Sequence, residues 1–225
     1  MQRYNSFYQI HKGLRALLYE TALHVQRADL QDPIERICVQ ERIHLLLALF
    51  EKHASSEDNF VFAAVKKYEP SVADAFEQEH DRDHALGEKL EAAANALTAD
   101  AGPAAAAALN TALVEFIVFN LEHMSREEDI INGILWRYYS DEELHGITMQ
   151  IIANIAPEKL ALFNAWMMRG LNNPEIAGWL QQVQALAPAF VYDDLVNTAR
   201  ENIGTERYAA IMGTTAAATV QEKIS

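Results

Sequence analysis

The sequence predicts an all-α protein, with an up-down-up-down four-helix bundle over residues 1–140 and a smaller helical region over residues 141–225. Three observations lead to this fold class. Helix-breaking residues divide the first part of the chain into four long stretches, apolar residues recur within each stretch at helical spacing, and the links between stretches are short. Because short links make sequential helices antiparallel, we expect the four helices to run up and down.

The first two helices are expected over residues 5–30 and 33–68, where an Asp-Pro pair ends one stretch and begins the next. With about 100° of rotation per residue, one apolar stripe contains His11 and the other contains His53. The stripe around His11 consists of Phe7, Leu14, Leu18, Ala22 and Val25. The stripe around His53 consists of Val39, Leu46, Leu49, Phe60 and Ala64. Both histidines are therefore predicted to face the core.

The third helix is expected over residues 71–98, with Ser71 as its N-cap after a proline. Its apolar stripe is weaker than the first two. The residues that share a face with His80 and His84 are Ala73, Phe76, Gly87 and Ala94. Both histidines of this helix are predicted to lie on the core face.

The fourth helix is expected over residues 103–139, and its apolar stripe surrounds His123. That stripe consists of Leu109, Ala112, Phe116, Phe119, Ile130 and Ile134. Beyond this helix the chain changes to shorter segments that begin at Pro157, Pro174 and Pro188. These segments predict the separate helical region, whose role the sequence leaves open.

Net charge and cysteine content narrow the classes of partner. The formal net charge is -14, so we expect neither nucleic acid nor an anionic membrane surface to bind. The single cysteine, Cys38, excludes an intrachain disulfide framework and is expected to be buried. The N-terminus lacks a secretory signal, and no segment approaches the roughly 20 apolar residues of a membrane span. A cytoplasmic protein is expected.

The polar residues on the predicted core faces are all metal-ligand types. Three of the four helices carry them in pairs spaced four residues apart, which places two side chains on one side of a helix. Nitrogen and carboxylate donors together suit iron, manganese or zinc better than calcium or magnesium. The predicted ligand set is His11, His53, Glu57, His80, His84, His123 and Glu127.

A height estimate supports a single layer of ligands. With about 1.5 Å of rise per residue, the histidines of all four helices fall within about 10 Å of one level.

A lone histidine on an apolar face is more often a core residue than a ligand, but five histidines and two carboxylates buried without a cation would be costly. His24 and His44 are rotated by about 140° and 180° from the stripes and are expected to be solvated. The sequence therefore predicts a metal site.

These residues resemble a known family. His11-Lys-Gly-Leu-Arg, His53-Ala-Ser-Ser-Glu57, Glu79-His80 with His84, and His123-Met-Ser-Arg-Glu127 are similar to the hemerythrin-like HHE cation-binding domain over roughly the first 140 residues. The resemblance implies two non-haem iron ions, Fe2+ or Fe3+, joined by an oxo or hydroxo bridge. It further implies that Glu57 and Glu127 bridge the irons and that the five histidines are terminal ligands.

Two details of the resemblance bear on function. The pair His80 and His84 matches the oxygen-carrying hemerythrins. Many HHE proteins have one histidine on this helix, so the resemblance leaves open whether both residues are ligands or one of them is spare. In the oxygen carriers the last carboxylate is an aspartate five residues after its histidine. Here Glu127 follows His123 by four residues, which is closer to bacterial HHE proteins and argues against simple oxygen carriage.

Other metal sites in helical proteins fit less well. A ferritin-like site needs Glu-x-x-His on two helices, and here His44 faces away from the core and Asn120 stands where the fourth helix needs a glutamate. The His-Glu-x-x-His string of zinc hydrolases is absent from the sequence.

Three functional hypotheses remain open. In the first, a non-enzymatic di-iron protein binds or senses a small ligand such as oxygen or nitric oxide, or binds iron itself. In the second, the same centre is an enzyme that turns over peroxide or nitric oxide. In the third, the metal is structural and the region over residues 141–225 binds a protein partner.

Overall fold

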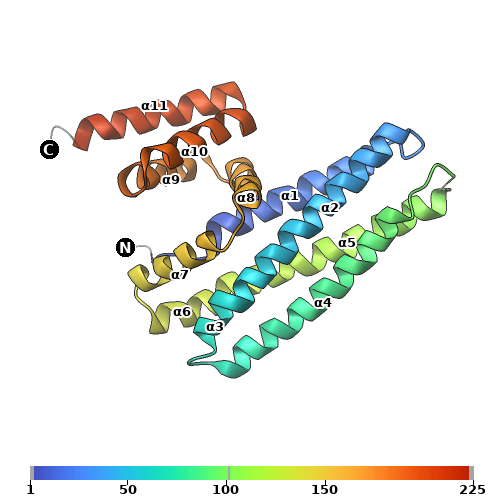
Figure 1. Cartoon of the computed structure of the whole chain (residues 1–225), viewed down its shortest axis with the longest axis horizontal. Helices are drawn as coiled ribbons and strands as arrows, with labels where there is room; N and C mark the ends of the chain where they lie inside the picture. Colours follow the sequence, from blue (N-terminus) through green and yellow to red (C-terminus); the bar gives the residue numbers. More distant parts are fainter. Residues whose placement is uncertain (1–2, 101, 223–225) are drawn as a thin grey trace. The chain divides into compact units, whose positions relative to one another are not determined.

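The protein is helical throughout the part of the chain that the structure describes. The computed structural model describes residues 3–100 and 102–222, and it contains no strand within them (Figure 1). Two of its helical segments are π-helices, labelled η, and the others are α-helices. In chain order the elements are α1 (Tyr8–Arg27), α2 (Pro33–Ser56), η1 (Glu57–Phe62), α3 (Ala63–Val65), α4 (Pro70–Asn95), α5 (Pro103–Arg126), η2 (Glu127–Ile131), α6 (Asn132–Tyr138), α7 (Asp141–Ala153), α8 (Pro157–Gly170), α9 (Asn173–Leu186), α10 (Ala189–Asn202) and α11 (Thr205–Glu222).

Local sequence signals set most helix starts. The Asp32 side chain accepts hydrogen bonds from two backbone N–H groups of the first turn of α2, at 2.7 and 3.1 Å, and so caps that helix. Ser140 and Glu143 form a capping box at the start of α7. The predicted N-cap at Ser71 is wrong, because α4 already begins at Pro70. A proline is tolerated in the first turn, where its missing N–H has no helical partner.

The chain divides into two compact units. The first consists of the chain up to Tyr8 together with Leu17–Ile155, and the second consists of Gln9–Ala16 together with the chain from Ala156 onwards. Helix α1 therefore contributes residues to both units. Helix α7 follows the boundary predicted at residue 140 and belongs to the first unit.

The first unit is built on long helices packed along their lengths. Helix α4 contacts both α2 and α5, and Figure 1 shows α4 and α5 running side by side. Helices α2 and α5 are also in contact, because Phe50 of α2 packs edge-on against Phe116 of α5 with ring centroids 5.3 Å apart. Most of the apolar residues predicted for the core are buried, and they include Phe7, Leu46, Leu49, Phe76, Leu109 and Phe116. Helical spacing in the sequence thus identified most of this core.

The predicted core is displaced where the two π-helices begin. The stripe containing His123 was expected to include Ile130, but that side chain is 39% exposed and the next residue, Ile131, is fully buried. In the second helix, Phe60 is half-buried, whereas Val61 and Phe62 are buried. A π-helix has about one more residue per turn than an α-helix, so each one shifts the buried positions that follow it.

Two further expectations concern single features of this unit. Cys38 is exposed on the first turns of α2, so the prediction that it is buried is wrong. The continuous helix Pro103–Tyr138 is long and apolar enough, by length and composition alone, to cross a membrane. The sequence predicts no such segment. The core helix of a soluble protein has the same length and composition, so these two properties do not distinguish it from a membrane span.

The second unit has its own core and a close helix contact. Helices α8 to α11 enclose a cluster of buried residues that includes Met168, Ile176, Leu180 and Leu195. Helix α8 lies against the residue 9–16 segment of α1, where a Cβ at Gly170 would lie 2.2 Å from the carbonyl oxygen of Lys12. The two backbones can approach this closely only because Gly170 has no side chain.

Candidate metal centre

The candidate ligands lie at matching positions on the helices. His53 lies in the last turn of α2, and Glu57 is the first residue of η1. His123 lies in the last turn of α5, and Glu127 is the first residue of η2. Each of these pairs therefore spans the junction between an α-helix and a π-helix. Such π-helical turns are rare and are frequent at functional sites.

One group of ligand atoms belongs entirely to the first unit. Glu57, His80, His123 and Glu127 are all buried, and one ligand atom from each lies within 4.8 Å of the others. The Nε2 atoms of His80 and His123 are 3.1 Å apart. Nε2 of His123 is 3.3 Å from Oε1 of Glu127, and Nε2 of His80 is 3.6 Å from Oε2 of Glu57. Four donor atoms thus converge on one point between α4, α5 and the two π-helices.

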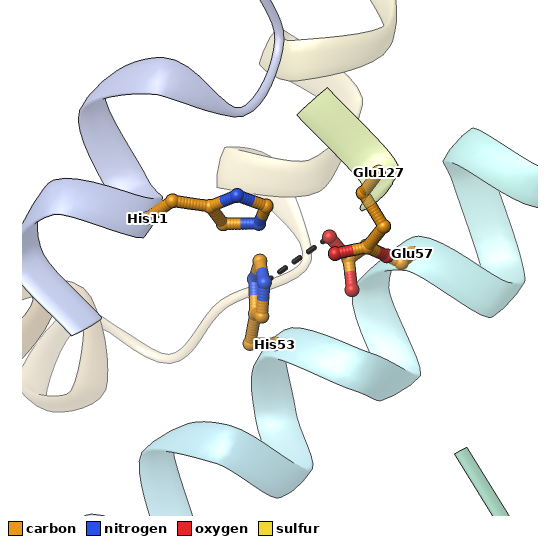
Figure 2. Close-up of side chains that lie close together, drawn as sticks. All are labelled: His11, His53, Glu57 and Glu127. Atoms are coloured by element: carbon orange, nitrogen blue, oxygen red, sulfur yellow. Dashed lines mark ion pairs between the residues drawn. The ribbon is translucent and has the colours of Figure 1, made fainter. Parts of the chain in front are cut away.

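A second group contains the same two glutamates. The ligand atoms of His11, His53, Glu57 and Glu127 also lie within 4.8 Å of one another. Figure 2 shows the two imidazole rings and the two carboxylates turned toward a common centre, with His53 Nε2 3.1 Å from Oε1 of Glu57. His11 and Glu127 are fully buried. Each group therefore offers two histidines, and Glu57 and Glu127 are members of both.

Carboxylates behind two of the histidines fix which ring nitrogen points inward. Nδ1 of His80 is 2.7 Å from Oδ1 of Asp58, and Nδ1 of His123 is 2.9 Å from Oε2 of Glu79. Arg126 donates to the other oxygen of Glu79. Because an ionised carboxylate only accepts hydrogen bonds, each Nδ1–H donates and each Nε2 is left for the centre. This is the arrangement found around metal-binding histidines.

The electrostatics of the cluster favour a cation. Burial by itself lowers the pKa of His123, but the hydrogen bond and charge of Glu127, with the hydrogen bond of Glu79 and the charge of Glu57, raise it to about 10. Burial also lowers the pKa of His80, and the hydrogen bond of Asp58 and the charge of Glu57 more than offset this. The buried carboxylates thus hold protons on two histidines. Metal ions would supply the same positive charge, so the donor set fits metal binding.

The structure brings together six of the seven predicted ligands. His11, His53, Glu57, His80, His123 and Glu127 are the members of the two groups. His84 is in neither group, because its side chain is 67% exposed and its Nδ1 lies 3.6 Å from Oε1 of Glu88. Of the histidines expected to be solvated, His44 is exposed beside Asn95, and His24 is half-buried.

One buried carboxylate beside the centre was missed by sequence reasoning. Asp83 is 8% exposed, and its Oδ1 accepts a hydrogen bond of 2.6 Å from Nδ2 of the buried Asn120. Burial raises the pKa of Asp83. The hydrogen bond from Asn120 and the charges of nearby histidines lower this pKa, but they do not offset the effect of burial. Asp83 is one turn from His80, and Asn120 is one turn from His123. The pair therefore links α4 to α5 in the layer next to the ligands.

Comparison with known proteins identifies the family. The family model of the hemerythrin HHE cation binding domain matches residues 3–135. The curated proteins and the solved structures that were compared with the chain gave no match. The matched segment contains all six residues of the two ligand groups. Because it also spans more than half of the 225 residues, the chain belongs to the hemerythrin family of HHE cation-binding domains.

Proposed function

We propose that this chain is a non-haem di-iron protein that binds or senses a small ligand, oxygen or nitric oxide, at two iron ions. In this proposal α1, α2, α4 and α5 form an up-down-up-down bundle around the irons. His80 and His123 are ligands of one ion, and His11 and His53 are ligands of the other. Glu57 and Glu127 bridge them.

The sharing of two glutamates between two ligand groups carries the proposal. A single ion uses one compact set of donors, whereas here two sets of four have the same carboxylates in common. A carboxylate has two oxygens, so it can bind a different ion through each. Placing two cations side by side also requires negative charge between them, and Glu57 and Glu127 provide it.

The types of donor support iron. Histidine nitrogen together with carboxylate oxygen suits non-haem iron, whereas calcium and magnesium prefer oxygen alone. Structural zinc sites are closed by four ligands and usually contain cysteine, and Cys38 of this chain is exposed at the start of α2. Manganese takes similar donors to iron, so measurement of metal content decides between them.

A small ligand suits the surroundings of the centre. Four protein donors per ion are fewer than the six of an octahedral iron, which leaves positions for an exogenous ligand. Phe62, Phe76 and Phe119 pack on the histidine rings, with ring centroids 5.3 to 5.8 Å from those of His80 or His123. Apolar rings of this kind restrict the access of water and favour a compact diatomic ligand.

Metal analysis with absorption spectroscopy tests the proposal. Protein freed of metal is loaded with ferrous iron without oxygen, desalted, and assayed for iron per chain before and after exposure to oxygen or nitric oxide. We expect two irons per chain and new charge-transfer absorption on exposure to the ligand. If the desalted protein retains no iron, the proposal is wrong.

The same sample separates ligand binding from catalysis. A binding or sensing protein takes up a stoichiometric amount of oxygen or nitric oxide. An enzyme that turns over peroxide or nitric oxide consumes many equivalents per centre. We expect stoichiometric uptake, and sustained consumption would favour the enzyme.

A further inference from the structure

An acidic groove runs between α2 and α4 in the first unit. Its volume is about 1120 Å³, and eight of its lining residues are aspartate or glutamate, while none is lysine or arginine. Two of the eight, Asp74 and Glu77, share an ion pair with Lys66, whose Nζ lies 2.8 Å from each carboxylate. The other six acidic residues are Glu51, Asp58, Asp81, Asp83, Glu88 and Glu91.

The groove leads to the candidate metal centre. His80 lines it, and His80 is also a member of the ligand group with Glu57, His123 and Glu127. Asp58, whose carboxylate holds Nδ1 of His80, lines it as well and has a side chain that is 39% exposed. The groove thus joins solvent to one of the residues whose Nε2 faces the centre.

Asp83 offers a free carboxylate oxygen at the deep end of this groove. The residue is more than nine-tenths buried, yet it is part of the groove lining. Its Oδ1 accepts the hydrogen bond from Asn120, which leaves Oδ2 without a hydrogen bond to any residue that the structure describes. Because Asp83 lines the groove, this oxygen can bind a cation in place of water.

We infer that this groove is the path by which a hydrated divalent cation reaches the metal centre, with Asp83 as a transient ligand beside His80. The inference rests on the proposed function. Carboxylates along a groove with buried, low-dielectric walls, here Phe50 and Phe116, concentrate cations and speed their arrival. His84 lines the same groove next to Glu88, so this histidine lies on the path although it is in neither ligand group.

The rate of metal uptake tests the inference. Metal-free protein is mixed with Co2+ at low ionic strength, and the appearance of the absorption bands of the bound ion is followed by stopped flow. Asp83→Asn keeps an oxygen that accepts the hydrogen bond from Asn120 but loses the charge. The double variant Glu51→Gln/Glu88→Gln removes two charges from the groove rim. We expect each variant to take up Co2+ about three- to tenfold more slowly than the unaltered protein.

The control is a double variant with the same change in net charge elsewhere. Glu142 and Glu201 are exposed and do not line the groove, so Glu142→Gln/Glu201→Gln should leave the uptake rate unchanged. The final Co2+ content should be equal in all variants, and high salt should abolish the effect of the rim variant.

The outcomes separate this inference from the proposed function. If the unaltered protein binds two ions per chain and all variants take them up at one rate, the path is wrong and the di-metal centre stands. The path is also wrong if Asp83→Asn lowers the final content rather than the rate, because Asp83 would then be a permanent ligand. If the unaltered protein takes up no metal, both the proposed function and the path are wrong.

Discussion

Removing His80 and removing Glu127 should have different effects on metal content, because His80 is in one ligand group and Glu127 is in both. We expect His80→Ala to bind one iron per chain, since the other group keeps all four of its members. We expect Glu127→Gln to bind none at the metal concentrations that saturate the unaltered protein, since both ions lose the carboxylate that lies between them.

The size of the effect follows from linkage between metal binding and folding. When free metal exceeds the dissociation constant by a thousandfold, each bound ion stabilises the folded state by about 4 kcal/mol. His80→Ala should therefore lose about 4 kcal/mol of metal-dependent stabilisation, and Glu127→Gln about twice that. Each value is the difference between metal-loaded and metal-free protein of the same variant, so the direct cost of the substitution cancels.

Urea unfolding with and without iron, together with iron analysis, provides the assay. His84→Ala is the matched control, because His84 is one turn from His80 on the same helix but its side chain is 67% exposed. It should keep both irons and the full metal-dependent stabilisation. The assignment of His80 to one ligand group and of Glu127 to both is wrong if His84→Ala loses an ion as His80→Ala does, or if Glu127→Gln still binds one.

Three further predictions concern the surroundings of the centre. Asp58→Asn should weaken iron binding about 10- to 100-fold in a competition titration without changing the iron content at saturation, because Asp58 only orients His80; an unchanged affinity would contradict this role. In metal-free protein the pKa of His123 is raised from 6.5 to about 10, so its proton stabilises the fold fully below pH 6.5, and that stabilisation disappears as the pH rises toward 10. Because a metal must displace this proton, calorimetry near pH 7.5 in buffers of different ionisation enthalpy should show proton release on binding, and heats independent of the buffer would count against it. Ile131→Ala should destabilise the protein by about 2–5 kcal/mol in urea unfolding, whereas Ile130→Ala should cost much less, and equal effects would refute the burial pattern.

The pairs His53 with Glu57 and His123 with Glu127 could be found from the sequence because their geometry is local. A spacing of four residues places both members on one side of a helix whatever the rest of the fold does. Prolines and an aspartate cap also identified the helix starts in this part of the chain. The convergence of the two glutamates depends on packing between helices, so the sequence supplied it only through the family resemblance.

The choice between His84 and Asp83 shows how a weak stripe misleads. Both residues fall within about 60° of His80 on a helical projection, so both are compatible with the core face. The buried residues Phe76, Leu90 and Ala94 are all rotated from His80 toward the side of Asp83. Centring the face on these apolar residues rather than on the histidine would have placed Asp83 in the core and His84 outside. The necessary signal was therefore present in the sequence.

The two π-helices could not be predicted from the sequence, although they contain the two glutamates that both ligand groups share. Each begins at one of the two shared glutamates, and the α-helix resumes within six residues. A π-turn has poorer packing and is rarely kept in a helix without a reason. If α2 and α5 remained α-helical beyond Glu57 and Glu127, then Phe60 and Ile130 rather than Val61 and Ile131 would face the core. Repetition of the same irregularity at both shared carboxylates indicates that the backbone is adjusted to hold these two side chains between the ligand groups, at the expense of regular helix geometry.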